Sequence, residues 1–214
     1  TFNYLEAAKI TGVKKFIFAS SGAVLGDADP PMHENMKTNP LSPYGASKLA
    51  GEAYCSAFFH SYSMETVALR FSNVYGPFSL KKQSLVAKFI KKVLEGEPLK
   101  IYGDGRQTRD FIYVDDVVEA IIASANKPNI GGQVFQIASN VETTINQLCE
   151  ILFPLLKEKG YVIPPIQNTK RGKGDSLRNF SQTNKAKNVL DWSCATNLNE
   201  GLTRTVEWLI NAQR

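Results

Sequence analysis

Three short apolar runs alternate with longer stretches of helical periodicity along this chain. The runs lie at residues 13–24, 66–71 and 133–138. The first is bounded by lysines and by glycine, as expected for a strand that is buried on both faces. Strands that alternate with helices are typical of a parallel sheet covered by helices, so the pattern predicts an α/β fold.

The helical stretches of the first half carry start and stop signals. Residues 2–9 have helical spacing and end before Thr11 and Gly12, and a second helix is predicted to run from Pro43 to about Tyr62. Ser42 is a suitable N-cap, and Pro43 fits the first helical position because its missing N–H is not needed there. A third helix is predicted over residues 115–125, and we expect four of its side chains to be buried. These are Val117, Val118, Ile121 and Ile122.

The remaining elements are predicted by the same periodicities. Residues 84–95 form an amphipathic helix whose apolar stripe is Leu85, Val86, Phe89, Ile90 and Val93. Further elements are expected as a loop over 26–41, a strand at 99–102, a helix from 143 or 144 to 156, and a helix at 202–210. We expect Leu190 and Trp192 to close a small lobe together with this last helix.

Candidate chemistry lies at the start of the 43–62 helix. Tyr44 and Lys48 are four residues apart, so their side chains share one helix face near its N-terminus. A neighbouring ammonium and a helix N-terminus both favour the phenolate, which could act as a general base. Ser20 and Ser21 end the first strand, and ligands of open α/β sheets gather at such strand ends. A chance pair on a surface helix and a simple Ser-Gly turn are the alternatives.

Several motifs together resemble the extended short-chain dehydrogenase/reductases, and among them the nucleotide-sugar epimerases such as UDP-galactose 4-epimerase. In chain order the motifs are Ser21, Tyr44-x-x-x-Lys48, Leu69-Arg70-Phe71-Ser72-Asn73-Val74-Tyr75-Gly76-Pro77, Ile101-Tyr102-Gly103-Asp104-Gly105 and Arg109-Asp110-Phe111-Ile112-Tyr113-Val114-Asp115-Asp116. Their order and their spread over most of the chain make the resemblance specific.

The resemblance implies a Rossmann-like doubly wound parallel sheet plus a small α/β substrate-binding lobe. Residues 1–72 and 113–139 would belong to the NAD-binding domain, and residues 73–112 and 140–214 to the lobe that binds the nucleotide sugar. The first βαβ units of the family, with their glycine-rich turn, have no counterpart before Thr1. We therefore expect a fragment or a separately supplied cofactor half, with poor NAD binding by the chain alone.

The resemblance also implies roles for particular residues. Ser21, Tyr44 and Lys48 would be catalytic, while Ser20, Tyr44, Lys48 and Phe71 would bind NAD. The UDP-sugar would be bound by Ser21, Asn73, Leu85, Tyr102, Arg109, Arg171 and Asn179. A turn role for Asn73 and an ion pair of Arg109 with Asp110 are the structural alternatives. Arg171 lies one residue before the family's arginine position, and Asn179 in place of a tyrosine hints at a 2-acetamido sugar.

The reaction implied is that of an NAD-dependent isomerase, a UDP-hexose or UDP-N-acetylhexosamine 4-epimerase that works through a 4-keto intermediate. Related dehydratases place Asp-Glu after the strand-end hydroxyl, where this chain has Gly22 and Ala23, and neither can transfer a proton. Two alternatives stay open. One is a non-catalytic fragment or remnant that binds a nucleotide sugar, and the other is a dehydratase or reductase of the same family.

Composition agrees with an enzyme that acts on a small molecule. The 214 residues are 43% hydrophobic, no apolar run approaches the ~20 residues of a membrane span, and no signal peptide is visible. The net charge of +5 comes without a base-reading module, so we expect no nucleic acid partner. Three widely spaced cysteines form no metal pattern and fit a reduced cytoplasmic protein. Relatives commonly form homodimers, which we expect here too.

Overall fold

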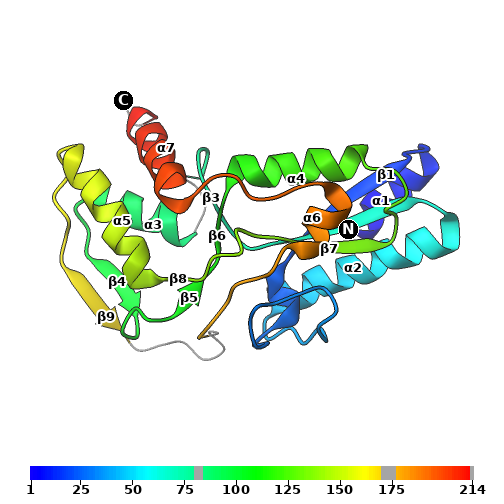
Figure 1. Cartoon of the computed structure of the whole chain (residues 1–214), viewed down its shortest axis with the longest axis horizontal. Helices are drawn as coiled ribbons and strands as arrows, with labels where there is room; N and C mark the ends of the chain where they lie inside the picture. Colours follow the sequence, from blue (N-terminus) through cyan, green and yellow to red (C-terminus); the bar gives the residue numbers. More distant parts are fainter. Residues whose placement is uncertain (80–83, 170–176, 213–214) are drawn as a thin grey trace.

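The computed structural model describes residues 1–79, 84–169 and 177–212, which form two lobes side by side (Figure 1). The larger lobe contains α1 (Phe2–Ile10), β1 (Lys15–Ser21), the 3-10 helix η1 (Gly22–Leu25), α2 (Pro43–Tyr62), β2 (Glu65–Phe71), α4 (Val114–Asn126), β7 (Gln133–Ile137) and α6 (Asn184–Leu190). The smaller lobe contains α3 (Leu85–Leu94), β4 (Leu99–Tyr102), α5 (Ile145–Glu158), β9 (Ile166–Thr169) and α7 (Leu198–Asn211). Within the described part of the chain, no helix is long and apolar enough to cross a bilayer.

A three-stranded parallel sheet in the order β1-β2-β7 forms the centre of the larger lobe. The three predicted apolar runs supply its strands, so the predicted α/β fold is confirmed. The register aligns Ser21 with Phe71 and Phe71 with Ile137, which brings the carboxyl ends of the three strands to one edge.

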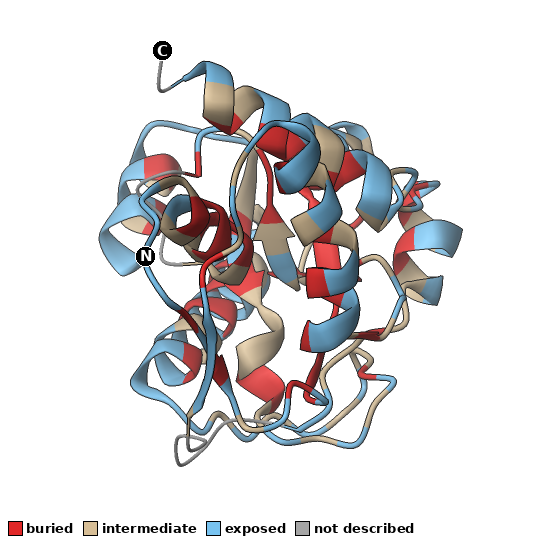
Figure 2. Ribbon diagram, turned by 90° about the vertical axis from the view of Figure 1, so that its left-hand side faces the viewer, coloured by how far each residue is buried: buried red, intermediate tan, exposed pale blue. Residues whose placement is uncertain are grey.

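Helices cover both faces of this sheet, as Figure 1 shows with α2 below the strands and α4 above them. On the α1 and α2 side the apolar core gathers around Phe18, Phe58 and Met64. On the α4 and α6 side it gathers around Leu69 and Phe135. The inner faces of the helices are accordingly buried and the outer faces exposed (Figure 2).

Two packing expectations are wrong. Val117 is buried, but Val118, Ile121 and Ile122 are 45%, 36% and 47% exposed. These three side chains lie on the part of α4 that none of the described elements covers. Trp192, with Leu190, packs in the α4 and α6 core of the larger lobe rather than in the small lobe, because its indole nitrogen donates to the Asp116 carbonyl at 3.0 Å.

The smaller lobe has its own core between α3, α5 and α7. The predicted stripe of α3 is buried except for half-buried Leu85, and it meets Leu148 and Leu152 of α5. Thr144 caps α5, as one of the two predicted starts requires, in a capping box with Gln147. The apolar residues Leu202, Val206 and Leu209 of α7 are buried as predicted, although α7 begins four residues earlier, at Leu198.

Short strands join the two lobes. β3 (Asn73–Tyr75) pairs in parallel with β6 (Phe111–Tyr113), and β5 (Thr108–Arg109) pairs antiparallel with β8 (Thr143–Thr144). β3 continues from β2 of the larger lobe, and β6 leads directly into α4. The predicted division at residues 72–73 and 112–113 therefore falls in strands that connect the lobes, and it stays a proposal.

Candidate active site

The start of α2 is held against the end of β1 by local contacts. The Ser42 hydroxyl accepts a hydrogen bond from the Gly45 N–H at 3.0 Å, and Pro43 occupies the first turn, both as predicted. A Cβ on Gly45 would lie 2.6 Å from the Ala23 carbonyl oxygen, which real Cβ atoms do not tolerate. Only glycine permits this close approach, which brings the first turn of α2 beside the end of the strand.

Ser21 and Tyr44 line the same cavity, whose volume is about 210 Å³. The Tyr44 side chain is 56% exposed, so its hydroxyl is open to a ligand or to water. The Lys48 ammonium lies 5.7 Å from the centre of the Tyr44 ring and donates a 2.8 Å hydrogen bond to the Ala19 carbonyl at the end of β1. The structure thus brings the three predicted catalytic residues together at one edge of the sheet.

Such an arrangement can exchange a proton with a bound alcohol. A phenol whose charged form is favoured by a nearby ammonium can act as a base, and a serine hydroxyl can hold the oxygen that loses the proton. The Ser21 hydroxyl already accepts a 3.2 Å hydrogen bond from the Ala23 N–H, which fixes its position and leaves its own hydrogen free for donation.

Ser20 does not join this group. It is 2% exposed, and its hydroxyl donates a 2.5 Å hydrogen bond to Glu52 on α2. Because successive strand residues point to opposite faces, Ser20 faces α2 while Ser21 does not. The Ser20 hydroxyl is therefore engaged with α2, and cofactor binding by Ser20 stays a prediction. Phe71, expected at the same site, is half-buried at the end of β2, where it pairs with Ser21.

A second cavity of about 170 Å³ adjoins the first, since Asn73, Leu85 and Phe111 line both. It brings together four of the predicted substrate residues, which are Asn73, Leu85, Tyr102 and Arg109. The Tyr102 ring is 45% exposed. Flat apolar walls beside an amide and a guanidinium suit a planar base that is attached to an anionic group.

Hydrogen bonds to main-chain carbonyls hold the two polar side chains of the second cavity, Asn73 and Arg109. The Asn73 side-chain amide donates to the Asp110 carbonyl at 3.1 Å, and the Arg109 guanidinium donates to the Thr108 carbonyl at 2.7 Å. The Asn73 amide and the Arg109 guanidinium are both hydrogen-bond donor groups, as binding of an anion requires. The Asp110 carboxylate accepts hydrogen bonds from the Ser72 and Ser139 hydroxyls, so it has partners other than its neighbour Arg109.

Arg171 and Asn179 are the remaining predicted substrate residues. Arg171 lies outside the described residues. Asn179 is half-buried beside the second cavity, where its N–H donates to the Thr108 hydroxyl at 3.3 Å, but it lines neither cavity. The hint that Asn179 leaves space for a 2-acetamido group is therefore not supported by direct lining.

Sequence reasoning missed several lining residues. Phe111 lies within the motif from Arg109 to Asp116, and it begins β6, where it pairs with Asn73 of β3. Ile145 of α5 and Gln107 also line the second cavity. The Gln107 side-chain amide is held there because it donates a 2.7 Å hydrogen bond to the Tyr102 carbonyl. Neither carries a sequence signal, because their positions depend on the approach of elements that are distant in the chain.

Comparison with known proteins adds relatives of the whole chain. Residues 1–138 match the model of the NAD dependent epimerase/dehydratase family. A UDP-glucuronate 4-epimerase of Thermodesulfobacterium geofontis is 37% identical over 97% of this chain, which spans 63% of that relative. Dehydratases match as well, among them dTDP-D-glucose 4,6-dehydratase of Mus musculus, at 31% identity over 95% of this chain and 58% of that protein.

Solved structures agree with the fold. UDP-glucose 4-epimerase of Thermotoga maritima with UDP-glucose has a TM-score of 0.87 at 38% identity, covering 98% of this chain and 68% of that one. UDP-N-acetylglucosamine 4-epimerase of Methanobrevibacter ruminantium M1, in complex with UDP-N-acetylmuramic acid, has a TM-score of 0.88 at 33% identity, covering 98% and 67%. The chain thus spans about two thirds of the proteins it resembles.

Proposed function

This chain belongs to the NAD dependent epimerase/dehydratase family, and on that premise we propose that it carries the catalytic residues of a UDP-sugar 4-epimerase that uses NAD. The observation that carries the proposal is that Ser21 and Tyr44 line one cavity at the strand ends, with the Lys48 ammonium beside the Tyr44 ring and bonded to the Ala19 carbonyl. UDP-hexoses and UDP-N-acetylhexosamines are the proposed substrates, since the relatives described above are named for UDP-sugars of these kinds.

The chain's own residues would handle the proton and the orientation of the sugar. Tyr44 would take the proton from the 4-hydroxyl of the sugar, and Ser21 would donate a hydrogen bond to the same oxygen. Lys48 would place a positive charge beside the reacting groups, since its ammonium lies 5.7 Å from the centre of the Tyr44 ring. The Ser21 hydroxyl and the Lys48 ammonium are each held by a hydrogen bond to the main chain, so these two groups need little reorganisation when a sugar enters.

The residues at the strand ends fit one part of NAD. An ammonium and a phenol beside the carboxyl ends of parallel strands are suited to the hydroxyls of a ribose, and the Phe71 side chain offers an apolar surface for a planar ring. Lys48, Tyr44 and Phe71 would hold the nicotinamide nucleoside. When bound, NAD would supply the hydride acceptor and donor for the sugar carbon.

The second cavity would bind the UDP part of the substrate. Leu85 and Tyr102 would enclose the base, while Asn73 and Arg109 would contact the diphosphate. A guanidinium is well matched to phosphate oxygens because it offers a planar fork of donors. The two cavities share Asn73 and Leu85, so a nucleotide sugar could extend from one into the other.

The residues after Ser21 favour an epimerase over a dehydratase. Elimination of water from a sugar requires an additional acid and base beside the strand-end hydroxyl. Here Gly22 and Ala23 begin η1, and neither side chain can carry a proton. We therefore propose epimerisation rather than dehydration for this chain.

A homodimer and a cytoplasmic location complete the proposal. Phe2 and Tyr4 of α1 and Tyr54 and Tyr62 of α2 are each at least 43% exposed, on two neighbouring helices. Aromatic side chains gathered in this way are typical of a surface that a second copy covers. The unpaired thiols of the three cysteines suit a reducing compartment.

The test is epimerisation itself. A version of this chain that also carries a dinucleotide-binding half would be incubated with NAD and with UDP-glucose, UDP-N-acetylglucosamine or UDP-glucuronate, and the 4-epimers would be separated by chromatography. Thermal-shift measurements with UDP and with NAD distinguish the alternatives, because a bound ligand raises the unfolding temperature. Stabilisation by UDP without epimerisation would favour a nucleotide-sugar-binding protein. Stabilisation by neither ligand would contradict the proposal.

A further inference from the structure

We propose that Asp110 is a positioning residue that sets the diphosphate ligands Asn73 and Arg109 relative to the catalytic end of the sheet. The role rests on the proposed function, because it acts through residues assigned to the UDP-sugar. Asp110 lies between β5 and β6, where the chain passes between the lobes, and it is fully buried.

The Asp110 carboxylate collects hydrogen bonds from three separate segments. One oxygen accepts from the Ser72 hydroxyl at 3.1 Å, the Ser139 N–H at 2.7 Å and the Ser139 hydroxyl at 2.8 Å. The other oxygen accepts from the N–H groups of Asn140 at 3.1 Å and Ser181 at 3.4 Å. Ser72 follows β2 and Ser139 follows β7, so this one side chain ties the ends of two sheet strands to the small-lobe connection.

The Asp110 main chain acts on the substrate residues directly. Its carbonyl accepts from both the Asn73 N–H at 3.0 Å and the Asn73 side-chain amide at 3.1 Å. Arg109 is its immediate neighbour, at the end of β5. Any rotation or shift of residue 110 therefore moves Asn73 and Arg109 together, relative to Ser21 and Tyr44.

The donor pattern explains why a carboxylate is suited to this position. All five partners are donors, and three of them are main-chain N–H groups that cannot turn into acceptors. An asparagine would place its NH₂ group against at least one of these N–H groups in either orientation. Burial raises the pKa of Asp110, while the hydrogen bonds from Ser139, Ser181 and Ser72 oppose that rise. The network thus fixes the Asp110 side chain in a position where its two oxygens accept all five hydrogen bonds.

Ser139→Ala and Asp110→Asn test this role, with Ser124→Ala as the matched control. Ser139 lines neither cavity of the proposed site, and its hydroxyl donates to Asp110. Ser139 is half-buried, whereas Ser124 is fully buried, and the Ser124 hydroxyl donates at 2.7 Å to the Ala120 carbonyl within α4, away from the junction. The measurements are the unfolding temperature, the affinity for UDP by calorimetry at 25 °C, and kcat and KM with UDP-glucose.

The positioning role predicts that both serine variants lower the unfolding temperature but that only Ser139→Ala weakens UDP binding. We expect UDP affinity to fall about threefold for Ser139→Ala, the scale of one ordinary hydrogen bond, and about tenfold or more for Asp110→Asn, the scale of a hydrogen bond to a charged group. KM for UDP-glucose should rise while kcat changes little, since the diphosphate ligands bind uniformly in ground and transition states. A purely structural defect would lower the active fraction and hence the apparent kcat at unchanged KM.

Each outcome is informative. Equal UDP affinity and KM in wild type and Ser139→Ala would overturn the positioning role even if Asp110→Asn fails to fold. Equal weakening by Ser124→Ala would also overturn it, because the effect would then be one of general stability. A wild-type protein without affinity for UDP would overturn the proposed function, and this role with it.

Discussion

The buried ion pair between Glu52 and Arg70 gives the sharpest test of how the active-site end of the sheet is built. Glu52 lies on α2 two turns after Tyr44 and is 7% exposed, while Arg70 on β2 is 4% exposed. Two parallel hydrogen bonds join them, at 2.9 Å and 2.8 Å, and Ser20 on β1 donates a third bond to Glu52. The pair therefore fixes α2 against both strands whose ends form the site.

Glu52→Gln should cost far more free energy of unfolding than an exposed substitution of the same kind. Removing one charge leaves the Arg70 guanidinium buried without compensation, and its Nη1 atom already has no hydrogen-bond partner among the residues that the structure describes. The expected loss is about 3–5 kcal/mol, the range for breaking a buried pair by removing one partner. For a chain of this size this corresponds to a fall in Tm of roughly 6–20 °C.

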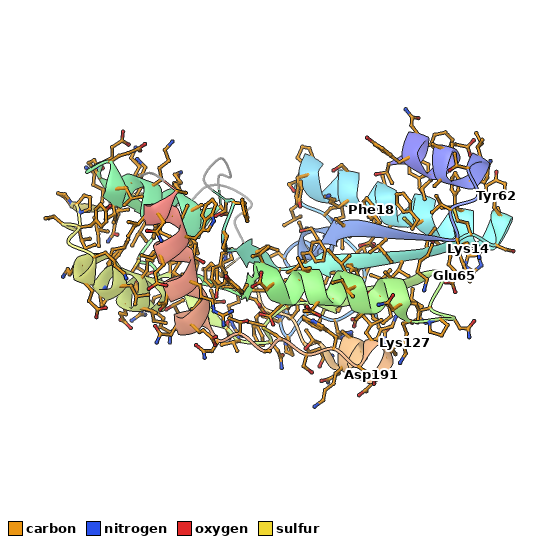
Figure 3. All side chains as sticks on the ribbon, turned by 90° about the horizontal axis from the view of Figure 1, so that it is seen from above. Lys14, Phe18, Tyr62, Glu65, Lys127 and Asp191 are labelled. Carbon is orange, nitrogen blue, oxygen red and sulfur yellow. The ribbon has the colours of Figure 1, made fainter. Side chains whose placement is uncertain are left out.

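Urea denaturation and calorimetry of wild type, Glu52→Gln and Glu207→Gln provide the comparison. Glu207 pairs with Lys159 at 3.2 Å on the surface, with both side chains more than two fifths exposed, so its loss should cost at most ~1 kcal/mol. A similar exposed pair, Lys127 with Asp191, is visible in Figure 3. If Glu52→Gln proves no more destabilising than Glu207→Gln, the buried pair does not anchor α2 and the reasoning is refuted.

Three further predictions concern the site and the thiols. Tyr44→Phe should keep UDP affinity in calorimetry but lower epimerase turnover by about 10²–10⁴-fold, the usual contribution of a general base; unchanged turnover would exclude Tyr44 from the mechanism. Arg109→Ala should weaken UDP binding by about tenfold or more while leaving uridine binding nearly unchanged, because the guanidinium is assigned to the diphosphate; equal loss for uridine would contradict that assignment. Burial raises the pKa of Cys55, Cys149 and Cys194 to about 12, so these thiols stay protonated at pH 8. A disulfide reagent should therefore react slowly with the native protein and rapidly after guanidinium has unfolded the chain. Rapid labelling of the native protein would show that the thiols are accessible.

Local signals were sufficient to predict where the site begins. Ser42 and Pro43 define the start of α2 through a cap and a fixed backbone angle, and both act within a few residues of sequence. The pairing of Tyr44 with Lys48 follows from the helical repeat. The strand runs and most helix bounds depend on equally local periodicities, so the α/β architecture could also be predicted.

The errors arose where long-range packing decides the outcome. Ser20 and Ser21 are the same residue type, but the pleat of the strand points their side chains to opposite faces of the sheet. Only the position of Glu52 on α2 shows which of the two hydroxyls is buried against a helix. Trp192 is expected in the small lobe, yet its contact with the Asp116 carbonyl places it in the larger lobe. Neither outcome could be predicted without knowing which distant elements meet.

The two buried acids divide the task of building the site between them. Glu52 anchors α2, and thus Tyr44 and Lys48, to β1 and β2, whereas Asp110 anchors the substrate connection to the ends of β2 and β7. Apolar contacts would stabilise the same packing, but they are non-directional and would tolerate small sliding movements. A hydrogen-bonded carboxylate accepts only from donors in a narrow range of positions. We therefore expect substitutions at Glu52 to change kcat and those at Asp110 to change KM, which separates the alignment of the base from the alignment of the diphosphate.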